Sequence, residues 1–411
     1  MFNLPKYGDG ICLARLGELL NALEIDRDRL RRISVVVTGS NGKGSTAAMC
    51  ASIGRAFGLR TGLFTSPHLL RFNERIQVDG IEIDDDAVAR LKFLVEASIA
   101  DVSRRLDQTF GAFEALFALA CLHFQESRCE FAVFEAGIGG RYDPVRLIGA
   151  RETCVTSIDL EHVELLGNSL ELIASDKSDA CAADGTIVYG ENCRPLRAHL
   201  VEYNRGRGCT PLFVGDEIAT GNESQSAAGQ HFAATLFLLW LQREQPRAAY
   251  DGIEAAIRAG LRDVQWPGRL EVIRQDPLTV IDVGHTPDGI RQSLAGLMAI
   301  HGTSGWILVT GVSRDKKADE IAGALAPAFD TIICTAARHK GADAQAIAAA
   351  ARLANPGASV HVAATMADAV RLSQEIARTQ KRKIYVAGGL FLAIEYRTVA
   401  QGGRTEDLAF F

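Results

Sequence analysis

The sequence predicts an α/β protein built on mostly parallel sheets. Apolar, β-branched runs alternate with Ala- and Leu-rich helical stretches along the 411 residues, and glycine (39) far outnumbers proline (11). Apolar residues make up 47% of the chain and charged residues 23%, which is an ordinary globular composition. At roughly 150 residues per domain, this length predicts two or three domains with large buried cores.

The predicted strands are β-branched runs of the kind found in buried parallel sheets, and they form two series. The first series is Ile33–Thr38, Arg60–Phe64, Phe131–Glu135, Thr153–Ile158 and Thr186–Tyr189. The second series is Thr279–Val283, Trp306–Thr310, Thr331–Thr335, Ser359–Ala363 and Lys383–Ala387. Helical patterns lie between the strands, at Ser45–Ala56, Phe113–Gln125, His231–Arg243 and Ala318–Ala326.

A domain boundary is predicted where the two series meet, at Trp266–Arg269. Its Pro-Gly pair is typical of a turn and ends any helix that runs from Tyr250 to Arg262. We therefore expect an N-terminal domain of residues 1–267 and a C-terminal domain of residues 268–411, both ordinary sizes.

Charge and composition disfavour several classes of partner. Lys and Arg number 44 against 50 Asp and Glu, so the net charge of −6 argues against bulk electrostatic binding of nucleic acid or an anionic membrane. The longest apolar run, Phe232–Leu241, is too short to span a bilayer. The first ten residues lack the pattern of a secretory signal, and the nine cysteines form no CxxC pair. These features predict a cytoplasmic protein with reduced thiols and no nucleic-acid or membrane partner.

A glycine-rich turn indicates phosphate binding. The predicted strand Ile33–Thr38 leads into GSNGKGST at Gly39–Thr46, followed by a helix. Glycines let backbone N–H groups converge on phosphate oxygens, and the helix N-terminus adds positive potential. In such a loop Lys43 would reach the outer phosphates, and Ser45 or Thr46 would offer a hydroxyl to Mg²⁺.

The loop departs from the strict GxxxxGK[ST] pattern. Val37 stands where the first glycine belongs, and Gly44 follows Lys43 where Ser or Thr belongs. A glycine-rich turn that only caps a helix therefore stays an alternative at this point.

Further motifs resemble one family. TGSNGKGST at residues 38–46 is the variant phosphate loop of the Mur ligase superfamily, and FTSPHLLRFNERIQV at 64–78 resembles its folylpolyglutamate synthase/dihydrofolate synthase branch. The other matching motifs follow in the same order: FE at 113–114, FEAGIGGRYD at 134–143, TSIDLEH at 156–162, Lys177, WPGRLE at 266–271, DVGHTP at 282–287 and AGGLFL at 387–392. The resemblance spans most of the chain.

The resemblance implies an ATP-dependent ligase that joins a carboxylate to the amine of an amino acid. It implies an acyl-phosphate intermediate, an ADP product, glutamate as the amino acid and a folate- or pteroate-type acceptor. It also implies a P-loop-containing, Mur-ligase-like ATP-binding domain at 1–267 and a smaller Rossmann-like ligase domain at 268–411. Members of this family are commonly monomers.

The resemblance also implies nucleotide-binding residues in both domains. These are Asn41, Gly42, Lys43, Gly44, Ser45, Thr46, Arg269, Asp282 and His285. Arg269 follows the linker and suits a phosphate clamp, although an interdomain salt bridge is an alternative. Asp282 ends a predicted strand and could instead cap the helix that opens at Pro287.

The catalytic residues implied by the family are Lys43, Glu135, His162 and Lys177, and two Mg²⁺ sites would use Ser45, Ser66, Glu135, His162 and Lys177. Glu135 ends a predicted buried strand and supplies the hard oxygen that Mg²⁺ prefers, although it could instead cap the next turn. Imidazole is not a favoured Mg²⁺ ligand, so His162 alone would be structural. Lys177 alone would be a solvated helix lysine, whereas the family places a CO₂-carbamylated lysine there.

Several positions depart from the family pattern, and they leave the identity of the carboxylate acceptor undecided. Arg146 replaces the last residue of the family's Asp-Ala-Thr-Asn, Phe232 stands where an Asn contacts adenine, and Ser178 and Asp179 replace Ala and Gly after Lys177. The alternatives are a paralogous Mur-type ligase with a non-folate carboxylate, and a non-catalytic nucleotide-binding regulator.

Overall fold

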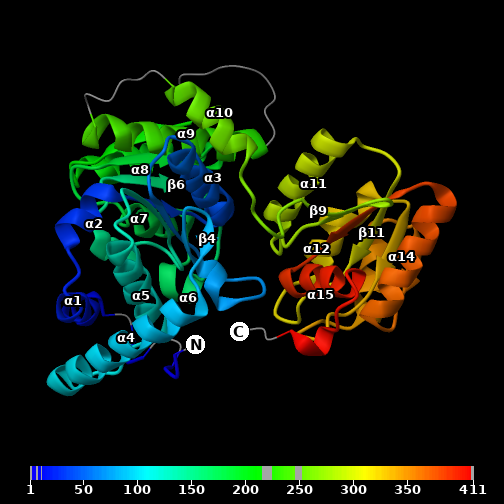
Figure 1. Cartoon of the computed structure of the whole chain (residues 1–411). Coiled ribbons are helices and arrows are strands. Elements are labelled where there is room, and N and C mark those ends of the chain that lie inside the picture. The colour runs from blue at the N-terminus through cyan, green and yellow to red at the C-terminus, as the bar shows by residue number, and fades with distance from the viewer. Residues whose placement is uncertain (1, 6–7, 11, 215–224, 246–251, 409–411) are drawn as a thin grey trace. The chain divides into compact units, whose positions relative to one another are not determined.

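The computed structural model describes residues 2–5, 8–10, 12–214, 225–245 and 252–408. The chain divides into two compact units between Gln265 and Trp266, with the short segment Leu69–Arg71 grouped with the second unit. Figure 1 shows the first unit from blue to green and the second from yellow to red. Within the described ranges, no helix has the length and apolar character needed to cross a membrane.

The first unit is built on an eight-stranded sheet in the order β4-β3-β2-β5-β1-β6-β7-β8. Its strands are β1 Ser34–Thr38, β2 Thr61–Phe64, β3 Ile76–Val78, β4 Ile81–Glu82, β5 Phe131–Glu135, β6 Glu152–Val155, β7 Thr186–Tyr189 and β8 Thr210–Phe213. Neighbouring strands from β2 to β8 in this order pair in parallel, whereas β3 and β4 add an antiparallel edge. The central strands β1, β5 and β6 are buried at every position, which explains their continuous apolar character.

Helices cover this sheet (Figure 1). They are α1 Leu13–Ala22, α2 Arg27–Ile33, α3 Lys43–Ala56, α4 Asp85–Leu106, α5 Ala112–Glu126, α6 Val163–Leu166, α7 Leu170–Ser178, α8 Arg197–Arg205, α9 Gln225–Glu244 and α10 Ile253–Arg262. Aromatic side chains bind the layers together: the Phe117 ring of α5 lies 5.8 Å from Phe134 of β5. The Trp240 ring of α9 lies 4.5 Å from Phe131, and its indole N–H donates to the Arg32 carbonyl at 2.8 Å.

The second unit contains a six-stranded sheet in the order β13-β12-β11-β14-β10-β9. Its strands are β9 Glu271–Gln275, β10 Leu278–Ile281, β11 Trp306–Thr310, β12 Thr331–Cys334, β13 Ser359–Val362 and β14 Lys383–Ala387. Only the β9–β10 pair is antiparallel among the strand pairs described in this sheet. Its helices are α11 Pro287–His301, α12 Ala318–Leu325, α13 Ala344–Ala354, α14 Met366–Gln380 and α15 Leu390–Ala400.

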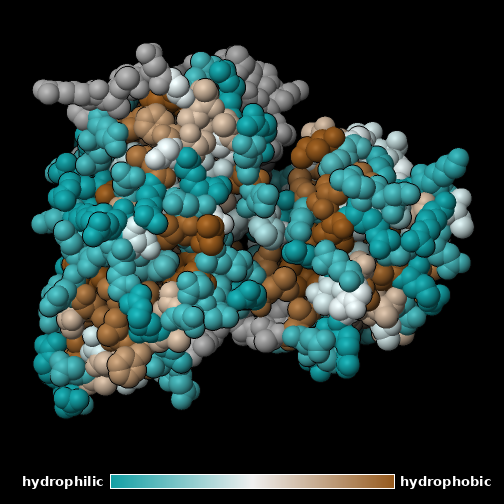
Figure 2. Space-filling model, in the orientation of Figure 1, coloured by the Kyte–Doolittle hydropathy of each residue, from teal (hydrophilic) through white to brown (hydrophobic). Residues whose placement is uncertain are grey.

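The predicted α/β class with two parallel-rich sheets is confirmed. Each predicted strand is present within a few residues of its expected bounds, and the four predicted helices are present as α3, α5, α9 and α12. The short strands β3, β4, β8 and β9 were not predicted. On the face seen in Figure 2, most of the surface of each unit is hydrophilic with scattered hydrophobic patches, as is usual for protein surfaces.

The fold gathers three loops at one edge of the first sheet. Strands β5, β1 and β6 are parallel neighbours, so their carboxyl ends lie side by side. The glycine-rich turn after β1, the turn after β5 and the loop after β6 all start at this edge. Ligands of open α/β sheets bind at such an edge, which makes it the candidate site.

Candidate functional site

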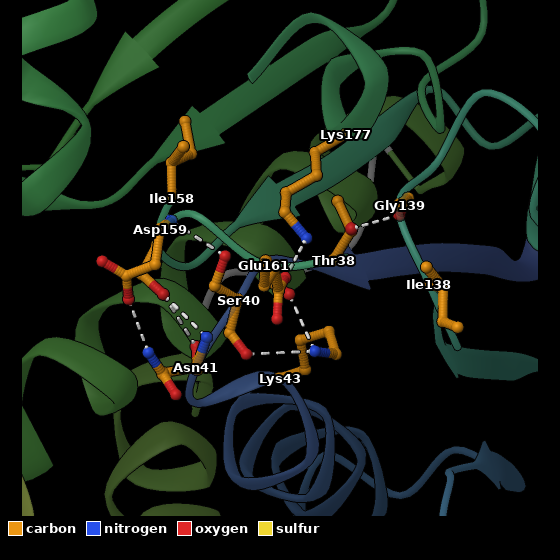
Figure 3. Close-up of polar contacts among 12 residues, drawn as sticks. Thr38, Ser40, Asn41, Lys43, Ile138, Gly139, Ile158, Asp159, Glu161 and Lys177 are labelled. Atoms are coloured by element: carbon orange, nitrogen blue, oxygen red, sulfur yellow. Dashed lines mark hydrogen bonds and ion pairs between the residues drawn. The ribbon is translucent and has the colours of Figure 1, made fainter. Parts of the chain in front are cut away.

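The phosphate loop after β1 is fastened to the loop after β6 (Figure 3). The Ser40 N–H donates to the Ser157 carbonyl at 2.9 Å, and the Asn41 N–H donates to the Ser157 hydroxyl at 2.8 Å. The Asn41 side-chain amide donates to Asp159 at 2.8 Å, and the Thr156 hydroxyl donates to the Asn41 carbonyl at 2.5 Å. Asn41 is therefore held by both its backbone and its side chain, which fixes the shape of the loop.

The end of this loop leaves a helix N-terminus open toward a ligand. Gly42 is the N-cap residue of α3. Its φ of +80° is a conformation that glycine adopts without steric cost, and it has no side chain with which to cap the helix. The N–H groups of Lys43, Gly44 and Ser45 form the first turn, where backbone donors lack partners inside the helix. This geometry fits an anion such as a phosphate group.

Lys43 and the two hydroxyls that follow differ in their surroundings. The Lys43 ammonium donates to the carbonyl of Gly39 at 2.7 Å, so its side chain folds back over the loop. Ser45 is half-buried at the helix start, whereas Thr46 is buried in the helix interior. Of the two predicted hydroxyls, Ser45 is therefore the better placed for a metal ion.

Glu135 and Ser66, from separate predicted motifs, lie together. Glu135 is buried at the end of β5, and one of its carboxylate oxygens accepts the Ser66 N–H at 2.9 Å. The Arg75 guanidinium donates to the Nδ1 of His68 at 2.7 Å, which places the proton of that imidazole on Nε2. Burial lowers the pKa of Arg75 to about 10, although the negative charges of Glu135 and Glu74 oppose this shift.

Asp143 caps the turn after β5. The Asp143 carboxylate accepts the N–H groups of Gly137 at 2.9 Å and Ile138 at 3.0 Å. Burial raises the pKa of Asp143 to about 6, against the effect of these donors and of Lys43. Asp143 therefore caps this turn, and the contact described for Glu135 is with the Ser66 N–H.

Lys177 is a buried ion-pair lysine rather than a solvated one. Its side chain is 1% exposed, and the ammonium donates to Glu161 at 2.8 Å (Figure 3). Burial lowers the pKa of Lys177, an effect that Glu161 opposes and the nearby Lys43 reinforces. Burial alone would raise the pKa of Glu161, but Lys177 and Lys43 together hold it below its usual value.

Asp176 of α7 fixes this helix to the turn after β5. The Asp176 carboxylate accepts the Gly140 N–H at 2.8 Å, and burial raises the pKa of Asp176. This contact joins the helix that carries Lys177 to the turn that follows Glu135. Asp143, Asp159, Glu161 and Asp176 were not among the predicted site residues.

His162 is exposed at the start of α6 with φ +46°. A non-glycine residue in the left-handed region is uncommon, and such strain is found more often at functional sites. In the described part of the chain, no group of three or more His, Cys, Asp or Glu side chains is arranged to hold a metal ion. Because Mg²⁺ keeps several waters and takes few protein oxygens, Ser45, Ser66 and Glu135 still fit its donor preference.

The three predicted residues of the second unit lie near its β10 end. Asp282 is 1% exposed and accepts hydrogen bonds from the Leu270 N–H, the Gly284 N–H and the Ser293 hydroxyl. The Arg269 guanidinium lies 3.9 Å from the Asp282 carboxylate. Both residues belong to the second unit, so this ion pair is not an interdomain salt bridge. His285 is exposed.

Asp282 does not cap the following helix. The residue that caps α11 is Thr286, whose side chain accepts the Gly289 N–H, so the N-cap interpretation of Asp282 is wrong. The roles of Arg269, Asp282 and His285 toward a nucleotide stay predictions.

The off-pattern residues have local structural partners. The Ser178 hydroxyl lies 2.6 Å from the Tyr189 hydroxyl, and Asp179 pairs with Arg141 at 2.6 Å. Phe232, expected near a nucleotide base, is 4% exposed in α9.

The two sheets and the altered phosphate loop define a P-loop ligase of the Mur type. In agreement, the family "Mur ligase, glutamate ligase domain" matches residues 268–389. The dihydrofolate synthase/folylpolyglutamate synthase of Bacillus subtilis is 30% identical over 347 residues, covering 76% of this chain and 77% of the relative. The folylpolyglutamate synthase of Lacticaseibacillus casei is 30% identical over 353 residues, covering 80% and 81%.

Solved structures agree with these relatives. Mycobacterium tuberculosis folylpolyglutamate synthase, complexed with ADP and AMPPCP, has a TM-score of 0.80 and 27% identity, covering 94% of this chain and 95% of that one. Escherichia coli FolC in complex with DHPP and ADP shares the fold, with a TM-score of 0.80, 22% identity, and coverage of 97% and 95%. The chain belongs to the folylpolyglutamate synthase/dihydrofolate synthase family.

Proposed function

We propose that this protein is an ATP- and Mg²⁺-dependent, ADP-forming ligase that joins glutamate to a folate- or pteroate-type carboxylate. The observation that carries the proposal is the GSNGKGST loop at the end of β1, with its open α3 N-terminus, in a chain of this family. The ADP and AMPPCP bound to the M. tuberculosis relative support nucleotide binding.

The proposed reaction has two steps. An oxygen of the acceptor carboxylate attacks the γ-phosphorus of ATP, the bond to the β-phosphate oxygen breaks, and ADP leaves. The neutral amine of glutamate then attacks the acyl carbon, loses a proton and expels inorganic phosphate. Activation is needed because a carboxylate is a poor electrophile.

Charge neutralisation is the main task of the protein in the first step. The N–H groups of Gly44 and Ser45 and the Lys43 ammonium are proposed to hold the β- and γ-phosphates, after Lys43 leaves the Gly39 carbonyl. Asn41 is proposed to keep the loop in shape through its contact with Asp159. Thr46, buried in α3, would support the loop from inside the helix.

The proposed Mg²⁺ ligands are Ser45, Ser66, Glu135 and His162, with Lys177 at a second site. Bound Mg²⁺ would neutralise charge on the phosphate oxygens. Glu135 and Ser66 support this assignment because the Ser66 N–H holds the Glu135 carboxylate at 2.9 Å. The Arg75 guanidinium interacts electrostatically with Glu135, so the two opposite charges lie close together at this edge of the sheet.

Carbamylation of Lys177 is part of the proposal. A neutral amine forms a bond to the carbon of CO₂ and loses a proton, and burial favours the neutral amine by lowering the pKa of Lys177. The product would place an anion beside Glu161, where the ammonium now lies at 2.8 Å. Lys177→Ala should be inactive and partly rescued by a short carboxylate. Rescue of this variant by bicarbonate alone would contradict the carbamate role.

The two domains are proposed to divide the substrates. Residues 1–267 would bind ATP, and residues 268–411 would bind the amino acid and supply Arg269, Asp282 and His285 to the nucleotide. The match of the glutamate ligase domain family to residues 268–389 supports this division.

A second candidate is a paralogous ligase with a non-folate acceptor. The observation that favours it is Arg146, an exposed cation at a position where the family has an uncharged residue. The Arg146 guanidinium donates to the Arg141 carbonyl at 2.8 Å. This cation stands beside the turn that Asp143 caps, at the candidate edge of the sheet.

The deciding experiment measures ADP and phosphate release with ATP, Mg²⁺ and glutamate, with and without dihydropteroate, dihydrofolate or tetrahydrofolate, followed by mass spectrometry of the product. We expect folate-dependent release and a product heavier by one glutamyl unit. ATP binding without folate-dependent release would favour the non-folate ligase, and binding without turnover on a broad panel of carboxylates would favour a regulator.

Two variants test the site assignment. Lys43→Ala and Glu135→Ala should each abolish turnover, because one removes a phosphate contact and the other a carboxylate at the proposed metal site. Wild-type rates for either would refute the assignment. Size-exclusion chromatography with light scattering tests the expected monomer.

A further inference from the structure

The turn that carries Arg269 has an uncommon backbone conformation. Gly268, before Arg269, has φ +77°, and Leu270, after it, has φ +45°. A leucine in the left-handed region is strained, and such a conformation persists only where the surrounding contacts impose it. The contacts that hold this turn therefore determine where the Arg269 side chain is directed.

One side of the turn is fastened to the end of β10. The Val283 N–H donates to the Gly268 carbonyl at 2.8 Å, and the Leu270 N–H donates to the Asp282 carboxylate at 3.1 Å. These two bonds use the carbonyl of Gly268 and the N–H of Leu270. They leave the Gly268 N–H, on the other side of Arg269, to be held by a different group.

Glu271 is that group. It is the first residue of β9, and its Oε2 accepts the Gly268 N–H at 2.7 Å. The Arg397 guanidinium of α15 donates to the same oxygen at 3.4 Å. Both side chains are mostly buried, with 23% of Glu271 and 22% of Arg397 exposed. One carboxylate oxygen thus joins the turn to a strand and to a helix.

The ion pair with Arg397 supports this arrangement. Removing the partner of a largely buried charge is costly, so the guanidinium of α15 favours a Glu271 carboxylate that stays beside it. In that position the carboxylate also accepts the Gly268 N–H. The turn is therefore held on both sides of Arg269, by Asp282 after it and by Glu271 before it.

We propose that Glu271 is a positioning residue for Arg269, whose side chain it directs toward the phosphates of the bound nucleotide. The inference rests on the proposed function, in which Arg269 clamps a phosphate. A guanidinium recognises phosphate oxygens through paired N–H groups in a fixed plane, so a change in the direction of its backbone weakens the contact. Glu271 acts through the turn and not by touching the nucleotide. A purely structural Glu271 would support the second unit without changing nucleotide affinity.

The first test measures nucleotide affinity in the full-length protein, by competition of AMPPCP against a fluorescent ADP analogue. Glu271→Ala removes the acceptor of the Gly268 N–H, and we expect the Kd for AMPPCP to rise about tenfold. Glu271→Gln keeps an oxygen that can accept this N–H and should recover most of the affinity. A folded Glu271→Ala protein with the Kd of the wild type would overturn the proposal.

A double-mutant cycle separates positioning from support of the fold. Arg269→Ala removes the guanidinium, so it should raise the Kd at least as much as Glu271→Ala does. Adding Glu271→Ala to Arg269→Ala should then cost no further affinity, because no guanidinium is left to misdirect. Losses that multiply would contradict positioning. An Arg269→Ala protein with wild-type affinity would refute the inference, whereas a wild type that binds neither nucleotide would refute the proposed function itself.

Hydrogen exchange examines the turn without any nucleotide. The amides of residues 266–271 should exchange faster in Glu271→Ala, because the Gly268 N–H loses its acceptor. Glu375→Ala is the matched control, since it removes an exposed carboxylate from α14 of the same unit and should leave this segment unchanged. Unchanged exchange in Glu271→Ala would overturn the role of this hydrogen bond. Urea unfolding followed by circular dichroism establishes that each variant is folded.

Discussion

Replacing Gly140 by alanine tests whether the buried amine of Lys177 depends on the packing of α7 against the turn after β5. An added Cβ would lie 2.6 Å from the Lys177 carbonyl oxygen and 2.8 Å from that of Asp176. Both are backbone atoms, and ordinary contact begins at 3.4 Å, so the helix end and the turn must separate by about 0.8 Å. The hydrogen bond from the Gly140 N–H to Asp176, now 2.8 Å, would lengthen as they move.

Two magnitudes follow from this displacement. Overpacking a tight interior costs about 1–3 kcal/mol, so we expect the free energy of unfolding to fall by that amount. A misplacement near 1 Å at a reacting group can cost about 10²-fold in rate, so kcat should fall by about 10- to 100-fold. The KM for ATP should change less, because Lys43 and its loop are fixed by β1 and by the loop after β6.

The assays are urea unfolding followed by circular dichroism and steady-state ligase turnover. Gly17→Ala is the matched control, since a Cβ in that α1 position meets no atom within 4 Å in the described structure. Its helix propensity should raise stability by about 0.5–1 kcal/mol without changing turnover. A Gly140→Ala protein with the stability and kcat of the wild type would refute the reasoning.

Two further predictions concern buried charges in the first unit. Glu114→Ala should lower the free energy of unfolding by about 3–5 kcal/mol. The Arg15 guanidinium, 1% exposed and 2.7 Å from Glu114, would lose its carboxylate partner and keep the Gly10 carbonyl as an acceptor. A loss below about 1 kcal/mol in urea unfolding would contradict this. Burial raises the pKa of Glu152 from an ordinary 4.5 to about 7 despite the ion pair with Arg243. The protonated Glu152 carboxyl therefore contributes stability that is fully present below pH 4.5 and is lost as the pH rises through about 7. The urea midpoint of the wild type should fall over this pH range, and Glu152→Gln should remove the part of the fall that is due to Glu152. An identical decline in the variant would show that another group is responsible.

The central strands were predictable because burial on both faces leaves a continuous apolar run. Phe131–Glu135 and Trp306–Thr310 are buried at every position. The β3–β4 hairpin has a sequence signal in its Asp79-Gly80 pair, which is typical of a tight hairpin turn. Both residues have positive φ in the structure, as such a turn requires. Its strands are short and half-exposed, so hydrophobic pattern alone does not identify them.

The charged contacts of the site could not be predicted from local pattern. Asp176 and Gly140, which are hydrogen-bonded, lie 36 residues apart in the sequence, and the ion pair of Arg15 and Glu114 joins residues 99 apart. The SDKSD sequence at 175–179 looks like a solvated helix surface, yet all five residues are buried. Burial of so many polar groups is possible only because each finds a partner in another element, and such partners are set by the fold.

The departures from the family pattern fall into two physical kinds. Ser178 and Asp179, which replace small residues, are bonded to Tyr189 and to Arg141, so they brace α7 without needing any change at the Lys177 amine. The Lys177 ammonium keeps its own contact with Glu161 at 2.8 Å.

Phe232 is a departure of the other kind. Its ring is almost completely buried, and a Cβ on Gly190 at the end of β7 would come within 3.1 Å of it. A buried phenyl ring adds packing energy but offers no hydrogen bond, whereas discrimination between bases of similar size depends on hydrogen-bond donors and acceptors. In the proposed function, the phosphate loop would contact only the triphosphate, which ATP and GTP share. Under the proposed function, base selectivity in this chain would therefore come from groups other than residue 232.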